Sequence, residues 1–100
     1  MQDVTTETFD QEVIQNDDPV IVLWGSKSNP LANRFALILH KNPPKNTKIV
    51  RIEIDDNPEL VMQYSIRFSP LLMLFMDGLV FVESRNFESF LENIKEWIAL

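Results

Sequence analysis

The feature that most constrains the fold of this chain is the continuous apolar run Val20–Trp24, which begins directly after Pro19. A short, uninterrupted apolar run bounded by turn residues is typical of a β-strand that is buried on both faces. Such a strand needs a layer of packed structure on each side of its sheet. The run therefore predicts a strand in the interior of the domain, buried on both faces.

The rest of the sequence alternates between helical and strand patterns. Thr6, followed by acidic residues, predicts the N-cap of a helix that ends near Gln15. The other expected elements, in chain order, are a helix that ends near His40, a strand that begins at Ile49, a helix that begins at Pro58, a hairpin over residues 71–82 and a closing helix over residues 87–98. The hairpin rests on Asp77-Gly78, a strong short-range hairpin signal between apolar runs. This order predicts one domain over residues 1–100, with a mixed central sheet and helices on both faces.

The residue inventory leaves little room for chemistry. The chain has no cysteine, which excludes disulfides, a cysteine nucleophile and thiolate metal ligands. Its single histidine, His40, makes a zinc site built on imidazoles implausible. The pairs Asp17-Asp18 and Asp55-Asp56 are adjacent residues in turns, where two carboxylates seldom converge on one ion, so they are interpreted as structural. No metal or other cofactor is expected.

Charge and hydropathy exclude two further classes of partner. The net charge is −6 and the nine basic residues form no dense cluster, which disfavours binding to nucleic acid. The apolar runs are far shorter than the roughly 20 residues that a membrane helix needs. The first residues lack the basic and apolar regions of a secretory signal, so a cytoplasmic location is expected.

The loop after Trp24 has the layout of an active-site turn but no evident reactive group. Ser28 as a nucleophile would need a neighbouring base, and His40 lies about three helical turns farther on, roughly 15 Å away at about 1.5 Å per residue. Ser28 or Asn29 is better explained as the cap of the following helix, with Pro30 in its first turn.

Several stretches, in this order, resemble the thioredoxin family over essentially the whole chain. They read "TFDQEV", "VLW", "IDDNPEL", "YSIRFSPLLMLF" and "DGLV". The resemblance implies a thioredoxin-like three-layer α/β fold. It aligns Ser28, Asn29, Pro30 and Leu31 with the family's Cys-Gly-Pro-Cys motif. It also implies a cis peptide bond before Pro70, with the backbone of the preceding residue available to pair with an extended peptide.

The sequence departs from the family where the family's chemistry lies. Both cysteine positions lack a thiol, and Val22 stands where the family has a buried aspartate. Lys27 replaces a tryptophan, and Ala36 replaces the proline that kinks the active-site helix. No counterpart of a late glycine is found, and residues 83–86 occupy that region. Thiol–disulfide exchange is therefore excluded for this chain acting alone.

The remaining candidate site is the groove between the degenerate loop and the segment before Pro70. Its expected residues are Trp24, Gly25, Ser28, Asn29, Pro30, Phe68, Ser69 and Pro70. Trp24 either packs in the core or contributes to the rim of the groove. An extended peptide could pair with the Ser69 backbone by strand addition, or the groove could be inherited geometry without a ligand.

The expected function is that of a redox-inactive, thioredoxin-like protein that is not an enzyme. It would bind a protein or peptide, as a chaperone, assembly factor or scaffold, and would be a monomer or weak homodimer. Two alternatives stay open. One is an enzyme of unrecognised chemistry, or one that borrows a partner's thiol; the other is a mainly structural domain that self-associates through its last helix or its hairpin.

Overall fold

One mixed five-stranded sheet forms the centre of the molecule, in the computed structural model that describes residues 1–99. The strands are β1 (Gln2–Asp3), β2 (Val20–Gly25), β3 (Lys48–Glu53), β4 (Leu71–Met76) and β5 (Leu79–Ser84). Their order in the sheet is β1-β3-β2-β4-β5. β2 lies at the centre, parallel to β3 and antiparallel to β4, and β4 pairs antiparallel with β5. The expected mixed sheet is confirmed, whereas the two-residue β1 was not predicted.

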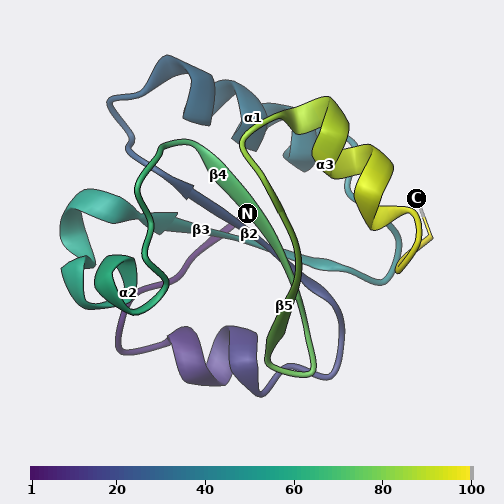
Figure 1. Cartoon of the computed structure of the whole chain (residues 1–100), viewed down its shortest axis with the longest axis horizontal. Helices are drawn as coiled ribbons and strands as arrows, with labels where there is room; N and C mark the ends of the chain where they lie inside the picture. The colour runs from purple at the N-terminus through teal and green to yellow at the C-terminus, as the bar shows by residue number, and fades with distance from the viewer. Residues whose placement is uncertain (100) are drawn as a thin grey trace.

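Helices cover both faces of this sheet (Figure 1). On one face lie α1 (Pro30–Lys41) and α3 (Phe87–Ile94). On the other face lie the short helix η1 (Asp10–Ile14) and α2 (Pro58–Gln63), with one 3₁₀ turn, η2 (Ile54–Asp56), before α2. The three-layer arrangement is therefore confirmed.

The central strand explains why both layers are needed. Val22 and Trp24 pack into the core cluster shared with η1 and α2, whereas Ile21 and Leu23 pack into the cluster shared with α1 and α3. All four side chains have no exposed surface. Because successive side chains of a strand point to opposite faces, one apolar run supplies the centre of two separate cores.

The hairpin between β4 and β5 turns as its sequence predicts. Asp77 has a φ of 52° and Gly78 a φ of 79°. Two successive positive φ values define the turn type that matches the twist of the flanking strands, and Asp-Gly is among its preferred dipeptides. A bulge follows, because Leu74 pairs with Val82 while Phe75 pairs with Val80.

The start of the first helix differs from its prediction. Thr6 does not cap it: the Thr6 N–H donates to Asn57 Oδ1 at 2.9 Å, and the residue before η1 is Phe9, with no capping side chain. The turn is also wide, since the Gln15 N–H donates to Asp10 O, five residues back. Thr6 is occupied by a partner 51 residues away, which no local pattern could reveal.

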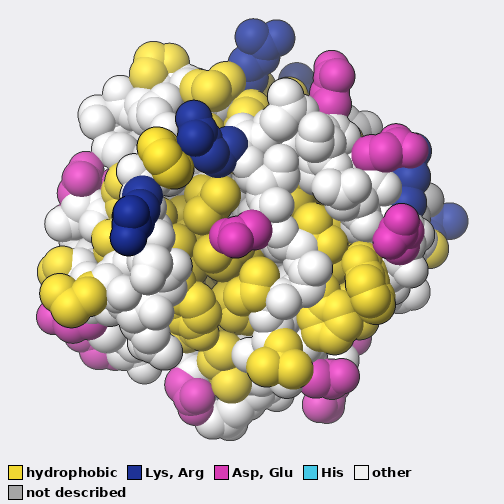
Figure 2. All heavy atoms as spheres, in the orientation of Figure 1, with side chains coloured by type: hydrophobic (Ala, Val, Ile, Leu, Met, Phe, Trp, Pro, Cys, Tyr) yellow, Lys and Arg dark blue, Asp and Glu magenta, His cyan; other side chains and the backbone are white. Residues whose placement is uncertain are grey.

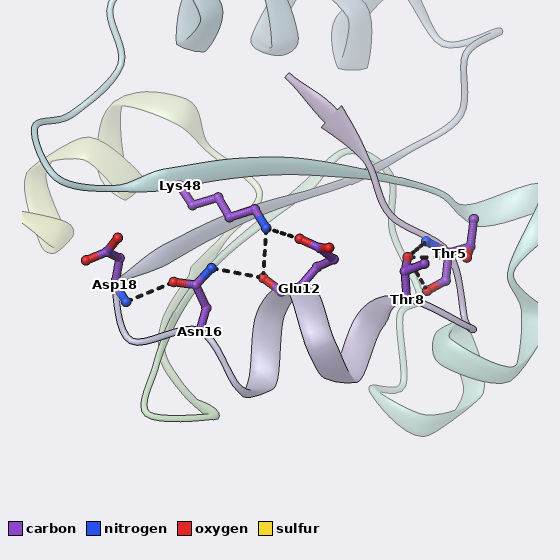
Figure 3. A network of polar contacts seen from close by, with 6 residues as sticks. All are labelled: Thr5, Thr8, Glu12, Asn16, Asp18 and Lys48. Carbon is purple, nitrogen blue, oxygen red and sulfur yellow. Dashed lines mark hydrogen bonds and ion pairs between the residues drawn. The ribbon is translucent and has the colours of Figure 1, made fainter.

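A polar network joins η1 to β3 (Figure 3). The Lys48 ammonium forms an ion pair with the Glu12 carboxylate and also donates to Glu12 O at 3.2 Å. Asn16 Nδ2 donates to the same carbonyl at 3.4 Å, and the Asp18 N–H donates to Asn16 Oδ1 at 2.9 Å. The hydrogen bond from Lys48 lowers the pKa of Glu12 below its ordinary value.

The two helices on the other face, α1 and α3, also differ from simple amphipathic helices. The apolar side chains of α1 are only partly buried, since Phe35 and Leu39 lie in the core while Leu31 and Ile38 are exposed. α3 ends at Ile94, and the chain after it makes a turn in which the Trp97 and Ile98 N–H groups donate to Ile94 O. Within residues 1–99, no helix has both the length and the apolar character needed to cross a membrane.

Candidate functional site

The candidate site lies where the loop from β2 to α1 meets the segment that leads into β4. Asn29 caps α1: its Oδ1 accepts from the N–H groups of Leu31 at 2.9 Å and Ala32 at 3.4 Å, with Pro30 at the first helical position. Of the two residues considered for the cap, Asn29 is the one that serves. The Ser69–Pro70 peptide bond is cis, as the family resemblance implied.

Asn29 also joins the two sides of the site. Its Nδ2 donates to Ser69 O at 3.3 Å. One amide side chain therefore holds the start of α1 and the backbone before Pro70 in a fixed relation. Among the described residues, the Ser69 N–H donates to no protein acceptor.

Close packing beneath this contact requires a glycine at position 25. A Cβ at Gly25 would lie 2.7 Å from Ala32 Cβ and 3.8 Å from Ser69 Oγ. The first distance is shorter than any ordinary contact between carbon atoms. Gly25 thus lets α1 approach the end of β2, and the Ser69 hydroxyl lies buried beside it without a hydrogen-bond partner.

The hydroxyl groups of the loop are engaged with one another and with a carboxylate. Ser26 Oγ donates to Asp55 Oδ2 at 2.9 Å and lies 2.8 Å from Ser28 Oγ. The Ser28 N–H also donates to Ser26 Oγ, at 3.2 Å. The Ser28 hydroxyl therefore contacts another hydroxyl and no base, while His40 lies in the last turn of α1. This is not the geometry of an activated serine.

The backbone of the loop is held from two sides. The Lys27 N–H donates to Glu53 Oε2 at 2.7 Å, and Asn33 Nδ2 donates to Lys27 O at 2.9 Å. Arg51 then connects the two sides, since its guanidinium donates to Asn33 Oδ1 at 2.7 Å and to Ser26 O at 3.3 Å. We call residues 26–29 the loop wall of the site.

Arg51 and Glu53 were missed by the sequence analysis as contributors to this wall. A signal was present, because both residues alternate with the core residue Ile52 in β3. In the sheet register Arg51 pairs with Leu23 and Glu53 with Gly25, so β3 ends beside the loop. The pairing of β2 with β3 places both residues beside the loop, and the local sequence does not reveal this pairing.

Trp24 does not belong to the rim of the groove, which corrects its inclusion among the binding residues. Its side chain has no exposed surface and packs against Phe9 and Tyr64, at ring-centroid distances of 6.3 and 5.7 Å. As the last side chain of β2 on that face, it supports the loop from below. Gly25 and Pro70 are buried too, so both shape the groove without offering side-chain surface.

The opposite side of the site is open. Phe68 is 53% exposed, and the guanidinium carbon of Arg85 lies 3.9 Å from its ring centroid. We call Arg67, Phe68 and Arg85 the arginine wall. A hollow of about 310 Å³ lies along it, lined by Ser65, Arg67, Phe68, Leu71, Glu83, Ser84 and Arg85.

A second hollow continues past Arg85. It measures about 370 Å³ and is lined by Leu31, Phe35, Arg85, Asn86, Phe87 and Glu88. Leu31, which stands at the place of the family's second cysteine, is 47% exposed here. Residues 83–86, which occupy the region where no counterpart of the family's late glycine is found, contribute side chains to both hollows.

Tyr64, whose ring packs against Trp24 beneath the loop, has a shifted pKa. Burial raises the pKa of Tyr64, and the Asp10 carboxylate adds to this shift, so the phenol stays protonated. Within residues 1–99, no three potential metal-ligating side chains gather in one place. The arrangement can offer hydrogen bonds, an aromatic surface and positive charge to a bound molecule.

Comparison with known proteins gives one consistent result. Residues 1–99 match the family model for thioredoxin. The chain is 35% identical over 78 residues to a thioredoxin from Rickettsia bellii (strain RML369-C), covering 75% of this chain and 74% of that protein. It is 37% identical over 78 residues to a thioredoxin from Porphyra purpurea, covering 75% and 73%. A thioredoxin 1 from Synechococcus elongatus is 35% identical over the same length, with the same coverage.

Proposed function

This chain belongs to the thioredoxin family, and from that premise we propose that it binds an extended segment of another protein and exchanges no disulfides of its own. The relatives are named thioredoxins, whereas this chain has no cysteine with which to form a mixed disulfide. Its work would be that of a chaperone, an assembly factor or a scaffold subunit. We keep the cytoplasm as its proposed location.

The observation that carries this proposal is the contrast between the two sides of the site. Hydroxyl and backbone groups of the loop wall are bonded within the protein, whereas the Ser69 N–H has no acceptor among the described residues and Phe68 is 53% exposed. A strand laid beside Ser69 would gain a backbone hydrogen bond, and one of its side chains could pack on Phe68. Strand addition of this kind derives affinity from the backbone and specificity from neighbouring hollows.

Site-specific photocrosslinking in the native cell tests the proposal. A photoreactive amino acid at position 68 should crosslink to a partner protein, because Phe68 is exposed and lines the hollow along the arginine wall. The matched control is position 62 on α2, since Met62 is 81% exposed and lines a different hollow, with Pro58, Glu59 and Gln63. Crosslinks from position 62 with none from position 68 would overturn the groove as the binding surface.

An enzymatic role is tested separately. A thiol-reductase assay of the purified chain, with and without the crosslinked partner, should show no turnover by the chain alone. Turnover in the absence of a partner would refute the proposal of a binding protein. Turnover only with the partner present would favour the alternative in which a partner's thiol enters the groove.

A structural, self-associating role draws on a different surface. Leu79 is 64% exposed and Val80 40% exposed at the outer edge of the sheet, and Trp97 is 47% exposed after α3. Sedimentation over a concentration series measures this association. A stable dimer that a charged substitution at Leu79 disrupts, together with an unoccupied groove, would replace the proposed function with this one.

A further inference from the structure

The arginine wall carries positive charge that no ion pair among residues 1–99 engages. Ion pairs among residues 1–99 join Lys27 to Asp3, Lys48 to Glu12 and Lys95 to Glu92, and none of them involves Arg67 or Arg85. Both arginines nevertheless line one hollow in a chain whose net charge is −6. Two arginines without an ion pair among residues 1–99 therefore lie around one hollow of an acidic chain.

One of these arginines is also held in position. The Arg85 guanidinium lies over the Phe68 ring, a cation–π contact that restrains a side chain otherwise free to rotate. Stacking uses the face of the guanidinium and leaves its N–H groups at the edge. Those groups form the planar fork that matches a carboxylate in two parallel hydrogen bonds.

We propose that the hollow along Arg67, Phe68 and Arg85 selects an acidic side chain of the bound segment, so that the partner is an acidic, extended peptide. This inference rests on the proposed function and adds the chemistry of the ligand. Phe68 would contact an apolar residue of the segment, and the arginines would receive the carboxylate of a residue that flanks it.

The position of the hollow fits a strand bound at Ser69. Arg67 and Phe68 directly precede Ser69 in the chain, and Arg85 directly follows the edge strand β5. On the face shown in Figure 2, dark-blue lysine or arginine side chains border a yellow apolar surface. A segment that pairs with Ser69 would therefore have positive charge and apolar surface within reach of its side chains.

Two carboxylates near the arginine wall would repel an acidic ligand. Glu83 lines the same hollow as the arginines, and Glu88 lines the neighbouring one. Repulsion from the other acidic groups of the chain is screened beyond about 8 Å at physiological ionic strength. The charges nearest the hollow therefore determine the affinity for an acidic peptide. Removing Glu83 should therefore strengthen binding of an acidic peptide, whereas removing the arginines should weaken it.

The probe is a pair of blocked peptides with flexible Gly-Ser ends, one with Glu-Val-Glu at its centre and the other with Gln-Val-Gln. Each is titrated into the ¹⁵N-labelled full chain, and dissociation constants are taken from the chemical shifts. The glutamate peptide should shift the signals of Phe68, Ser69 and Arg85. It should bind about tenfold more tightly than the glutamine peptide, which is what one charge-assisted interaction supplies.

Matched variants separate a local effect from a general one. Arg67→Gln combined with Arg85→Gln should abolish the preference for glutamate. Arg34→Gln combined with Lys41→Gln removes the same charge from α1 and should preserve the preference, because neither residue lines either hollow. Glu83→Gln should tighten binding of the glutamate peptide about twofold to threefold, the effect of one nearby like charge at the surface.

The outcomes separate this inference from the function on which it rests. Equal affinity for both peptides at the Phe68 hollow would overturn the acidic preference and leave the proposed function standing. An equal loss in the α1 control would overturn it as well, because the effect would be one of net charge. No shift at Phe68 or Arg85 with either peptide also refutes it, and the photocrosslinking experiment then decides the proposed function independently.

Discussion

The two walls of the site differ in how far their side chains are bonded within the protein. In the loop wall, Ser26 and Ser28 are bonded to each other and to Asp55, and the backbone around Lys27 is held from β3 and α1. In the arginine wall, Phe68 is exposed and Arg85 has no ion-pair partner among the described residues. The wall that aligns with the family's Cys-Gly-Pro-Cys motif is bonded internally, whereas the other wall presents exposed aromatic and arginine side chains.

This difference separates stability from binding. Substitutions at the loop wall and beneath it should lower the free energy of unfolding, because they break packing or internal hydrogen bonds. Substitutions in the arginine wall should change the binding of a ligand and leave unfolding nearly unaltered. The comparison fails if the two walls respond alike.

The largest effect is expected beneath the loop wall. Trp24→Ala removes a fully buried indole and should destabilise the protein by about 3–5 kcal/mol. Denaturant unfolding followed by circular dichroism measures this change. The control is Trp97→Ala, since Trp97 is 47% exposed and should cost clearly less. Equal losses would show that Trp24 does not support the loop.

The next largest loss of stability is expected where α1 approaches β2. Gly25→Ala would place a methyl group 2.7 Å from Ala32 Cβ and should destabilise the protein by about 1–3 kcal/mol through overpacking. Ala32→Gly in the same chain removes the clashing atom, so the second substitution should recover part of the loss. A loss unchanged in the double variant would contradict the steric explanation.

A smaller effect is expected for the side chain that joins the two walls. Asn29→Ala removes the helix cap and the contact with Ser69 O, and should cost about 0.5–2 kcal/mol. Ser28→Ala in the same loop wall removes only an exposed contact between two hydroxyl groups, so its loss should be smaller, within about 0.5 kcal/mol. Thermal unfolding of both variants, at matched pH and salt, compares them. The cap assignment fails if Ser28→Ala costs more.

Still less change is expected in the arginine wall. Arg85→Gln removes an exposed cation–π contact, which is worth at most about 1 kcal/mol. Its unfolding curve should therefore nearly overlay that of the parent chain, while its affinity for the acidic peptide falls. A loss of stability as large as that of Gly25→Ala would mean that the arginine is structural.

A region remote from both walls provides a reference for the dependence on pH. Lys48 lowers the pKa of Glu12 in the folded chain, so this carboxylate binds fewer protons folded than unfolded. The stabilisation is then fully present above the ordinary glutamate pKa and is lost as the pH falls through the lowered value. Glu12→Gln should flatten the acid limb of the stability curve. An unchanged acid limb would contradict the role of Glu12.

The fold was predictable wherever neighbouring residues determine the structure. The run Val20–Trp24 implied two apolar layers, and Asp77-Gly78 specified its turn without help from the rest of the chain. Asn29 and Pro30 likewise carry a helix start in their own chemistry. Each of these signals acts within a few residues, which is why reading the sequence sufficed.

Contacts between distant segments were not predictable in the same way. Thr6 has the character of a cap, yet it donates to Asn57, and Arg51 reaches Asn33 and Ser26 only because β3 lies beside β2. Trp24 could be assigned to the core or the rim only once the elements covering it were known. The separation of the site into a bonded and an open wall is a property of the assembled sheet.

The double engagement of Asn29 has a consequence for how occupancy of the groove could be detected. Its amide nitrogen contacts the Ser69 carbonyl, while its oxygen accepts from the first free N–H groups of α1. A ligand that competes for that carbonyl perturbs the same side chain, and with it the exchange of the Leu31 and Ala32 amide protons with solvent. Amide exchange at the beginning of α1 should therefore report whether a ligand has bound at the Ser69 carbonyl.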